Sequence, residues 1–142
     1  MTRDAIKLPQ TEVAVVIPFH DVDLMGVAWH GHYAKYFEIA RCALLDQISY
    51  NYQEMKDSGF AWPIIEMKLR YAKPARFGQR VMVRARLVEY ELRLKIDYVI
   101  TDAESGERLT KGHTIQVAVN AQAEELLLSS PAILYEKLGI AR

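Results

Sequence analysis

The chain has 142 residues, 51% of them hydrophobic by a broad count, and its 18 basic side chains are balanced by 18 acidic ones. This length is typical of one domain with one core. The mean hydropathy of -0.07 and the 25% of charged residues exclude a disordered or membrane-embedded chain. The single cysteine excludes an internal disulfide and a Cys-rich zinc site.

The charge and apolar patterns also limit where the protein acts. Residues 1–7 are charged and lack the apolar region of a secretion signal, so we expect a cytoplasmic protein. No stretch approaches the roughly 18 consecutive apolar residues of a spanning helix, and no membrane insertion is expected. The zero net charge argues against a nucleic-acid partner.

One segment, residues 67–88, contains seven basic side chains and no acidic one. It predicts either a solvated strand face or a local anion site. The seven are Lys68, Arg70, Lys73, Arg76, Arg80, Arg84 and Arg86.

In the N-terminal half, alternating apolar residues predict a first strand over residues 13–19. A loop over 20–31 follows, and helical spacing then predicts a helix of about 17 residues over 33–48, about 25 Å long. Residues 51–58 predict a short second helix, which Gly59 ends in the left-handed conformation.

The C-terminal half is mostly strands. Four further runs alternate apolar and polar residues and predict strands over 65–71, 81–87, 92–100 and 115–119. Near the C-terminus, Ser130 is expected to cap a last helix, with Pro131 at its first position and Gly139 at its end. The order β-α-β-β-β-β with short connections predicts an α+β domain, in which one long helix packs on an antiparallel sheet.

The densest cluster of reactive groups lies between the first strand and the long helix, in the run HDVDLMGVAWHGHY from His20 to Tyr33. A carboxylate near a glycine supplies a base or nucleophile, and backbone N–H groups that enter a helix stabilise developing negative charge. This pairing suits attack on a carbonyl. The same residues also suit a plain turn, in which Asp23 only stabilises the loop.

Other chemistries fit the sequence less well. The histidines and aspartates of the loop are possible metal ligands, but their spacing matches no familiar signature, and no metal is expected. No GxSxG elbow is present for Ser-His-Asp catalysis. Cys42 lies in the middle of the predicted helix without an evident base, so we expect a small core or interface residue.

The run from Phe19 to Arg41 resembles a family signature: D-x-D-x-x-G, then W-H-x-x-Y, then E-x-A-R. It is similar to the signature of hotdog-fold acyl-CoA thioesterases of the 4-hydroxybenzoyl-CoA thioesterase and YbgC type. About ten constrained positions match in order, which is more specific than any single pair of residues. The turn YAKPARFG at residues 71–78 and the strand order are also similar. The resemblance therefore implies a single hotdog thioesterase domain over residues 1–142.

This resemblance implies hydrolysis of an acyl-CoA with a small or medium, aliphatic or aromatic acyl group. Asp23 would be the catalytic carboxylate, either as a nucleophile that forms an acyl-enzyme anhydride or as a general base that activates water. The backbone N–H of His30 would polarise the thioester carbonyl, and its ring either orients the thioester or lies at the surface. CoA is part of the substrate, and no cofactor is implied.

Other residues of the motif are expected to support the substrate. Gly26 either lets the loop approach the substrate or supplies a positive φ, and Trp29 is expected to bind the substrate. Tyr33 and Tyr36 line the acyl pocket or belong to the core. Asp21 is expected to hold the loop by bonds from its side chain to the backbone.

The resemblance also implies an assembly, because hotdog domains of this length pair into a continuous sheet. We expect a homodimer or homotetramer with the active site between subunits. Ala61 and Trp62, within residues 60–63, would then face Asp23 of another copy. The basic segment from Lys68 to Arg86 becomes a candidate for the phosphates of CoA, because guanidinium groups match phosphate geometry.

Three alternatives stay open on this fold. One is a hydratase or dehydratase, which would need its own His and acid arrangement. Another is a binding or scaffold protein that holds an acyl chain without hydrolysing it. The third is a thioesterase whose acyl group is carried on acyl carrier protein instead of CoA.

Overall fold

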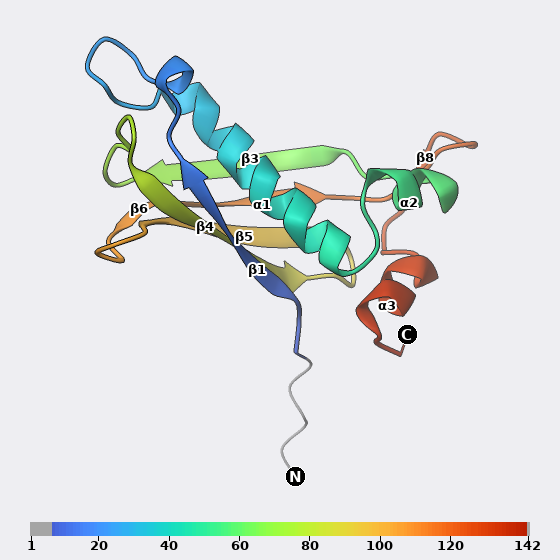
Figure 1. Cartoon of the computed structure of the whole chain (residues 1–142). Helices are drawn as coiled ribbons and strands as arrows, with labels where there is room; N and C mark the ends of the chain where they lie inside the picture. Colours follow the sequence, from blue (N-terminus) through green and yellow to red (C-terminus); the bar gives the residue numbers. More distant parts are fainter. Residues whose placement is uncertain (1–6, 142) are drawn as a thin grey trace.

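The computed structural model of the protein describes residues 7–141. Five long strands form one sheet in the order β1-β4-β5-β6-β3, every neighbouring pair is antiparallel, and helix α1 lies across one face (Figure 1). The predicted α+β arrangement of one long helix on an antiparallel sheet is confirmed. The strands are β1 (Gln10–Val16), β3 (Ile64–Tyr71), β4 (Arg80–Glu89), β5 (Leu94–Asp102) and β6 (Arg108–Gln116).

Helix α1 (Tyr33–Gln47) has 15 residues and follows a 3-10 turn over His30–His32. Its apolar residues face the sheet as the spacing predicts, and Phe37, Ala40 and Leu44 are buried. The ring of Phe37 stacks on that of Tyr98 in β5, with centroids 4.4 Å apart and an interplanar angle of 8°. This stack joins the middle of the helix to the middle of the sheet.

Gly112 of β6 provides the space for that stack. A Cβ atom at this position would lie 2.7 Å from the Phe37 ring and would collide with the carbonyl oxygen of Lys68 in β3. Only glycine fits at this position, because Phe37 of the helix and the backbone of the edge strand β3 both lie too close for a Cβ atom.

A small second sheet and two short helices lie beyond the C-terminal end of α1 (Figure 1). The short helix α2 begins with a capping box between Asn51 and Glu54, and Gly59 follows it with φ 88°, as predicted. No helix within residues 7–141 is long and apolar enough to cross a bilayer. The elements are α2 (Tyr52–Asp57), β2 (Phe60–Ala61), β7 (Val119–Asn120), β8 (Glu125–Leu126) and α3 (Ala132–Leu138).

The boundaries of two strands differ from the prediction. β1 ends at Val16, and Phe19 belongs instead to a 3-10 turn over Phe19–Asp21. The last long strand begins at Arg108 and leaves the sheet after Gln116, whereas alternation predicted residues 115–119. The positions of β6 that face α1 are Thr110, Gly112 and Thr114, which are not apolar, so the first part of the strand shows no apolar alternation. A bulge at Leu109, where the register with β5 shifts, also interrupts the period-2 pattern at its start.

The predicted cap of the last helix was also wrong. Pro131, with extended backbone angles (φ -71°, ψ 161°), holds the N-cap position of α3, and no side chain caps this helix. Ser130 lies one residue earlier, and its buried hydroxyl has no hydrogen-bond partner among the described residues. Gly139 ends the helix with φ 70°, as predicted.

Replacing Gly112 with alanine should destabilise the fold by about 1–3 kcal/mol, because the new Cβ forces β3 or Phe37 to move. Urea unfolding followed by circular dichroism measures this loss. The neighbouring exposed substitution Lys111→Ala is the control and should change the free energy of unfolding by less than about 0.5 kcal/mol. Equal stability of the Gly112→Ala variant and the wild type would contradict the close packing.

Candidate active site

The loop between β1 and α1 folds into a short hairpin over residues 22–28. Val22 and Ala28 form an antiparallel bridge, and the N–H of Asp23 donates to the carbonyl of Val27 at 3.0 Å. The N–H of Gly26 donates back to the carbonyl of Asp23 at 3.0 Å. Gly26 has φ 73°, so this position needs the conformation that glycine adopts at low cost.

The carboxylate of Asp23 is exposed at the base of this hairpin. Its Oδ1 accepts hydrogen bonds from the N–H of Met25 at 2.8 Å and of Val27 at 3.3 Å. No described residue donates to Oδ2. One carboxylate oxygen is therefore oriented by the loop, while the other remains available for a substrate or a water molecule.

A second turn, over residues 74–79, holds the hairpin from the side. The N–H of Ala28 donates to the carbonyl of Ala75 at 2.7 Å, and the N–H of Phe77 donates to the carbonyl of Gly26 at 2.9 Å. The same turn contacts α1, because the N–H of Ala75 donates to the Tyr33 hydroxyl at 2.8 Å. The hairpin and the first turn of α1 are thus fixed to one segment.

Asp21 makes the other connection between loop and helix. Its carboxylate is 1% exposed, and it accepts hydrogen bonds from Lys35 Nζ at 2.6 and 2.7 Å and from the Tyr36 hydroxyl at 2.8 Å. His20 Nε2 and His32 Nδ1 approach it at 3.5 and 3.6 Å. Asp21 therefore binds side chains of α1, and not the backbone groups that we expected.

This environment keeps Asp21 ionised. Burial acts to raise the pKa of Asp21, but the hydrogen bonds from Lys35 and Tyr36 and the charge of Lys35 outweigh it, so the pKa lies below the ordinary value of 3.8. Burial and the neighbouring Asp21 carboxylate raise the pKa of Tyr36, which keeps this hydroxyl protonated as a donor. Tyr36 thus supports the loop and is buried in the core.

The residues between the hairpin and α1 form a 3-10 turn. His30 is its first residue, two positions after the hairpin ends, and its side chain lies outside the described part of the chain. The Trp29 side chain is 62% exposed and meets the ring of His32 edge to face at 5.7 Å. A Cβ on Gly31 would collide with the Trp29 indole, so this glycine lets the indole lie against the turn.

The other predicted substrate-binding residues lie at the opposite end of α1. The buried Trp62 donates from Nε1 to the hydroxyl of Tyr50 at 3.0 Å, three residues beyond the end of the helix. Ala61 is its exposed neighbour. A 15-residue helix is about 22 Å long, so one chain does not bring Ala61 and Trp62 to Asp23.

Ala61 and Trp62 line a mostly apolar groove of about 750 Å³ between α1, α2 and the small sheet. Glu38 and Arg41 of α1, which pair at 3.5 Å, also line it. Further lining residues are Cys42, Leu45, Met55, Phe60 and Val119. Such a groove has the size and polarity of a small-molecule site.

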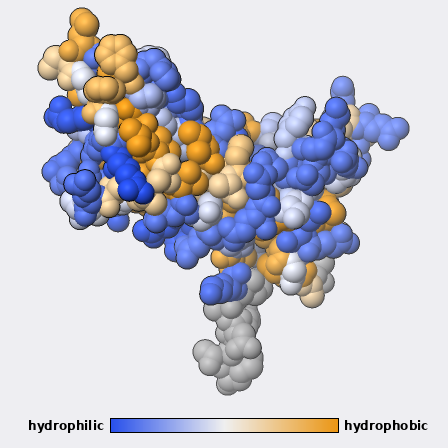
Figure 2. Space-filling model, in the orientation of Figure 1, coloured by the Kyte–Doolittle hydropathy of each residue, from blue (hydrophilic) through white to orange (hydrophobic). Residues whose placement is uncertain are grey.

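Exposed apolar side chains gather on the hairpin itself. Figure 2 shows them at the upper left, above the N-terminal end of α1. Leu24 and Met25 are fully or largely exposed, and Phe19 and Phe77 pack edge to face at 5.6 Å with more than half of each side chain exposed. Exposed apolar clusters of this kind are typical of contact sites.

The cations of the basic segment, residues 67–88, do not all lie on one surface of the protein. Lys68, Arg70, Arg84 and Arg86 point to the face opposite α1, because they alternate with residues that face the helix. Arg76 lies beside the hairpin, where it forms a bridge with Val27. The segment therefore does not form one continuous anion site, and its role toward CoA phosphates stays a prediction. No three His, Cys, Asp or Glu side chains among the described residues gather as a metal site.

The sequence profile of the thioesterase-like superfamily matches residues 17–136. The chain belongs to this superfamily. Its fold is the hotdog fold, and it is a thioesterase, as the motif predicted. The hairpin and α1 lie within the matched range, so the superfamily profile includes the candidate site.

Individual proteins show the same relationship. The Synechocystis protein sll0410 is 28% identical over 128 residues, which cover 89% of this chain and 77% of that protein. A DHNA-CoA thioesterase from Staphylococcus aureus is 26% identical in the structural match, with a TM-score of 0.75 over 84% of this chain and 80% of the other. Slr0204 of Synechocystis, a 1,4-dihydroxy-2-naphthoyl-CoA thioesterase, shares the fold with a TM-score of 0.81 at 20% identity, over 92% of this chain and 96% of its own.

Substitution of Asp21 by asparagine should lower the free energy of unfolding by about 1–3 kcal/mol at neutral pH, because the hydrogen bonds to a charged acceptor are lost. The pKa of Asp21 is lowered by folding, so its contribution is present above pH 3.8 and is lost as the pH falls through the folded-state pKa. The difference between wild type and variant should therefore shrink below pH 3.8. Urea unfolding at several pH values measures it, with the exposed Asp57→Asn as control. A difference that stays constant with pH would contradict the ionised, paired state.

Proposed function

We propose that this thioesterase hydrolyses an acyl-CoA to the free acid and CoA, with Asp23 as its catalytic carboxylate. The observation that supports it is the state of this side chain: Oδ1 is held by two backbone N–H groups, while no described residue donates to Oδ2, on an exposed hairpin just before α1. A carboxylate needs orientation and a free lone pair to act on a carbonyl. Both conditions are met without another side chain.

Two routes use the same geometry. In the first, Oδ2 attacks the thioester carbonyl carbon, the C–S bond breaks, the CoA thiolate leaves and is protonated, and water then hydrolyses the anhydride. In the second, Oδ2 takes a proton from a water molecule whose oxygen attacks the same carbon, the C–S bond breaks, and the CoA thiolate leaves and is protonated. In both, the carbonyl oxygen becomes negative, and the N–H of His30 at the turn before α1 is our candidate donor to it.

We further propose that the site is shared between two copies. β3 is an edge strand of the sheet, and Ile64, Ile65 and Met67 on it are exposed. Antiparallel pairing of two β3 strands would place the start of one beside the end of the other. Tyr71, at the end of β3, packs against Tyr33 near the hairpin at 4.9 Å.

In such a pair, Ala61 and Trp62, which lie just before β3, would take part in the site of the other copy. Trp62 and Ala61 directly precede Ile64, so antiparallel pairing would carry them and their apolar groove toward the hairpin of the other copy. The groove would receive a small or medium acyl group, aliphatic or aromatic, while Asp23, Gly26 and Trp29 approach the thioester. A homodimer is the smallest assembly with this arrangement.

The variant Asp23→Asn should lower kcat by about three to four orders of magnitude, because the amide neither attacks the carbonyl nor accepts a proton from water. Thiol release from a panel of aliphatic and aromatic CoA esters measures this loss. Circular dichroism should show an unchanged fold, and Asp57→Asn should retain wild-type turnover. Wild-type turnover by Asp23→Asn would refute the assignment.

Single turnover in heavy-oxygen water tests the nucleophilic route. Label in Asp23 requires an anhydride that water opens at the Asp23 carboxyl carbon, whereas the general-base route places the label in the product acid alone.

A mixing experiment tests the shared site. Ala61→Gln should lower kcat/KM at least about tenfold by filling the groove, and its exposed position permits folding. When Asp23→Asn and Ala61→Gln chains are refolded together, a heterodimer contains one intact site, so about a quarter of wild-type activity should return at equal mixing. Activity no higher than the sum of the separate variants would show that each site belongs to one chain.

A further inference from the structure

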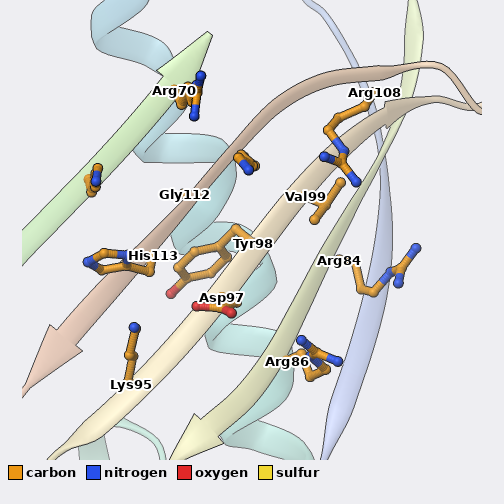
Figure 3. Close-up of a pocket in the computed structure, with 12 residues that line it drawn as sticks. Arg70, Arg84, Arg86, Lys95, Asp97, Tyr98, Val99, Arg108, Gly112 and His113 are labelled. Carbon is orange, nitrogen blue, oxygen red and sulfur yellow. The ribbon is translucent and has the colours of Figure 1, made fainter. Parts of the chain in front are cut away.

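The sheet face opposite α1 forms a basic groove of about 510 Å³, shown in Figure 3. Its lining contains Asp97 as the one carboxylate among the described residues. The cations come from β3, β4, β5 and β6, so residues far apart in the sequence meet on one surface. They are Lys68, Arg70, Arg84, Arg86, Lys95, Arg108 and Lys111.

The strand register arranges these cations in two walls. Across the sheet, Arg84 is paired with Val99, Val99 with Lys111, and Lys111 with Arg70. The next row contains Arg86 on β4, Asp97 on β5, His113 on β6 and Lys68 on β3. Long basic side chains thus lie on both sides of the short Val99. At about 4.8 Å between strands, the outer strands of the groove are about 14 Å apart.

The positive charge of this groove is poorly neutralised within the chain. Among residues 7–141, Arg84 has Glu12 at 3.7 Å, and His113 is held by Glu66 at 2.6 Å. No described carboxylate lies within 4.0 Å of the side-chain nitrogens of Arg70 or Lys111, although these two cations are directly opposite each other. Like charges in opposed positions destabilise a sheet. An external anion would relieve this repulsion.

The side chains in the groove also discriminate between kinds of anion. Tyr98 is the aromatic residue of the lining, and its ring stacks on Phe37 of α1, on the opposite side of the sheet. The other ring of the lining is that of His113, which Glu66 holds at 2.6 Å with 18% of its side chain exposed, so the groove presents little aromatic surface on which a base of single-stranded nucleic acid could stack. The zero net charge of the whole chain also gives no long-range attraction to a polynucleotide.

We propose that this groove binds an acidic α-helical segment of a partner protein. An α-helix with side chains is about 10–12 Å across, so it would lie over the inner strands β5 and β6, with the backbones of β4 and β3, about 14 Å apart, on its two sides. Carboxylates on its two flanks would face Arg84 and Arg86 of β4 and Lys68 and Arg70 of β3, and Lys111 of β6 would lie beneath it. A second copy of the same face is not a suitable partner, because it carries the same charge.

The test uses a fluorescent, Glu-rich helical peptide of about 20 residues, long enough to form a helix in water. Its matched control contains Gln in place of every Glu. Fluorescence anisotropy should show salt-dependent binding of the Glu peptide by the full chain and no binding of the Gln peptide. Arg84→Glu and Lys111→Glu should each weaken binding at least about fivefold, whereas Lys7→Glu, the same change at an exposed cation elsewhere, should alter it less than about twofold.

Several outcomes would overturn the proposal. These are no binding of the Glu peptide, equal binding of the Gln peptide, and unchanged affinity in both groove variants while circular dichroism shows a native fold. Tighter binding of oligo(dT) of equal charge would assign the groove to nucleic acid. Displacement of the peptide by free CoA at lower concentration than by unlabelled peptide would assign it to the phosphates of the substrate.

Discussion

The buried carboxylate of Asp21 joins the two elements that create the site. It lies before the hairpin in the sequence, yet its partners Lys35 and Tyr36 belong to the first turn of α1. An uncompensated charge in this position would cost several kcal/mol, so the loop and the helix are stable only when they meet in this one arrangement. Asp23 lies two residues later, and the N–H groups of Met25 and Val27 orient its carboxylate. A loop rich in small and exposed residues thus has a defined geometry without a large core of its own.

The hairpin and the apolar groove lie at opposite ends of α1, which limits what one chain can do alone. The hairpin lies at the N-terminal end of α1, where unpaired backbone N–H groups suit negative charge, and the apolar groove lies at the C-terminal end. Reactive group and apolar pocket are separated by the length of the helix. The dimer that we propose would bring the two together, because the edge strand β3 runs from the groove to the hairpin and offers a surface along which two copies would meet.

The sequence allowed the fold class, the long helix and the loop before it to be predicted because each depends on local signals, but it did not show that this loop forms a hairpin. Alternation predicted the interior of β4 and β5, and the spacing of Phe37, Ala40 and Leu44 predicted which side of α1 is buried. Tertiary effects were missed. Lys35 occupies a polar position of the helix and gave no sign that it would reach back to Asp21. The inward positions at the start of β6 are Thr110, Gly112 and Thr114, so no apolar alternation marked this part of the strand. Similarly, Lys95, Arg108 and Lys111 join the basic face only through strand register, which a linear charge count does not contain.

The charged residues along the edge strand β3 favour one way of pairing with β3 of a second copy over another. On the face opposite α1 it presents Glu66, Lys68 and Arg70 in succession. Antiparallel pairing near the middle of the strand would set Glu66 opposite Lys68 or Arg70 of the second copy, which is favourable. Parallel, in-register stacking would set each charge against its own copy and would be repelled, and such stacking is the arrangement found in many amyloid fibrils. The same eight residues would thus favour a closed pair of chains over an open-ended fibre.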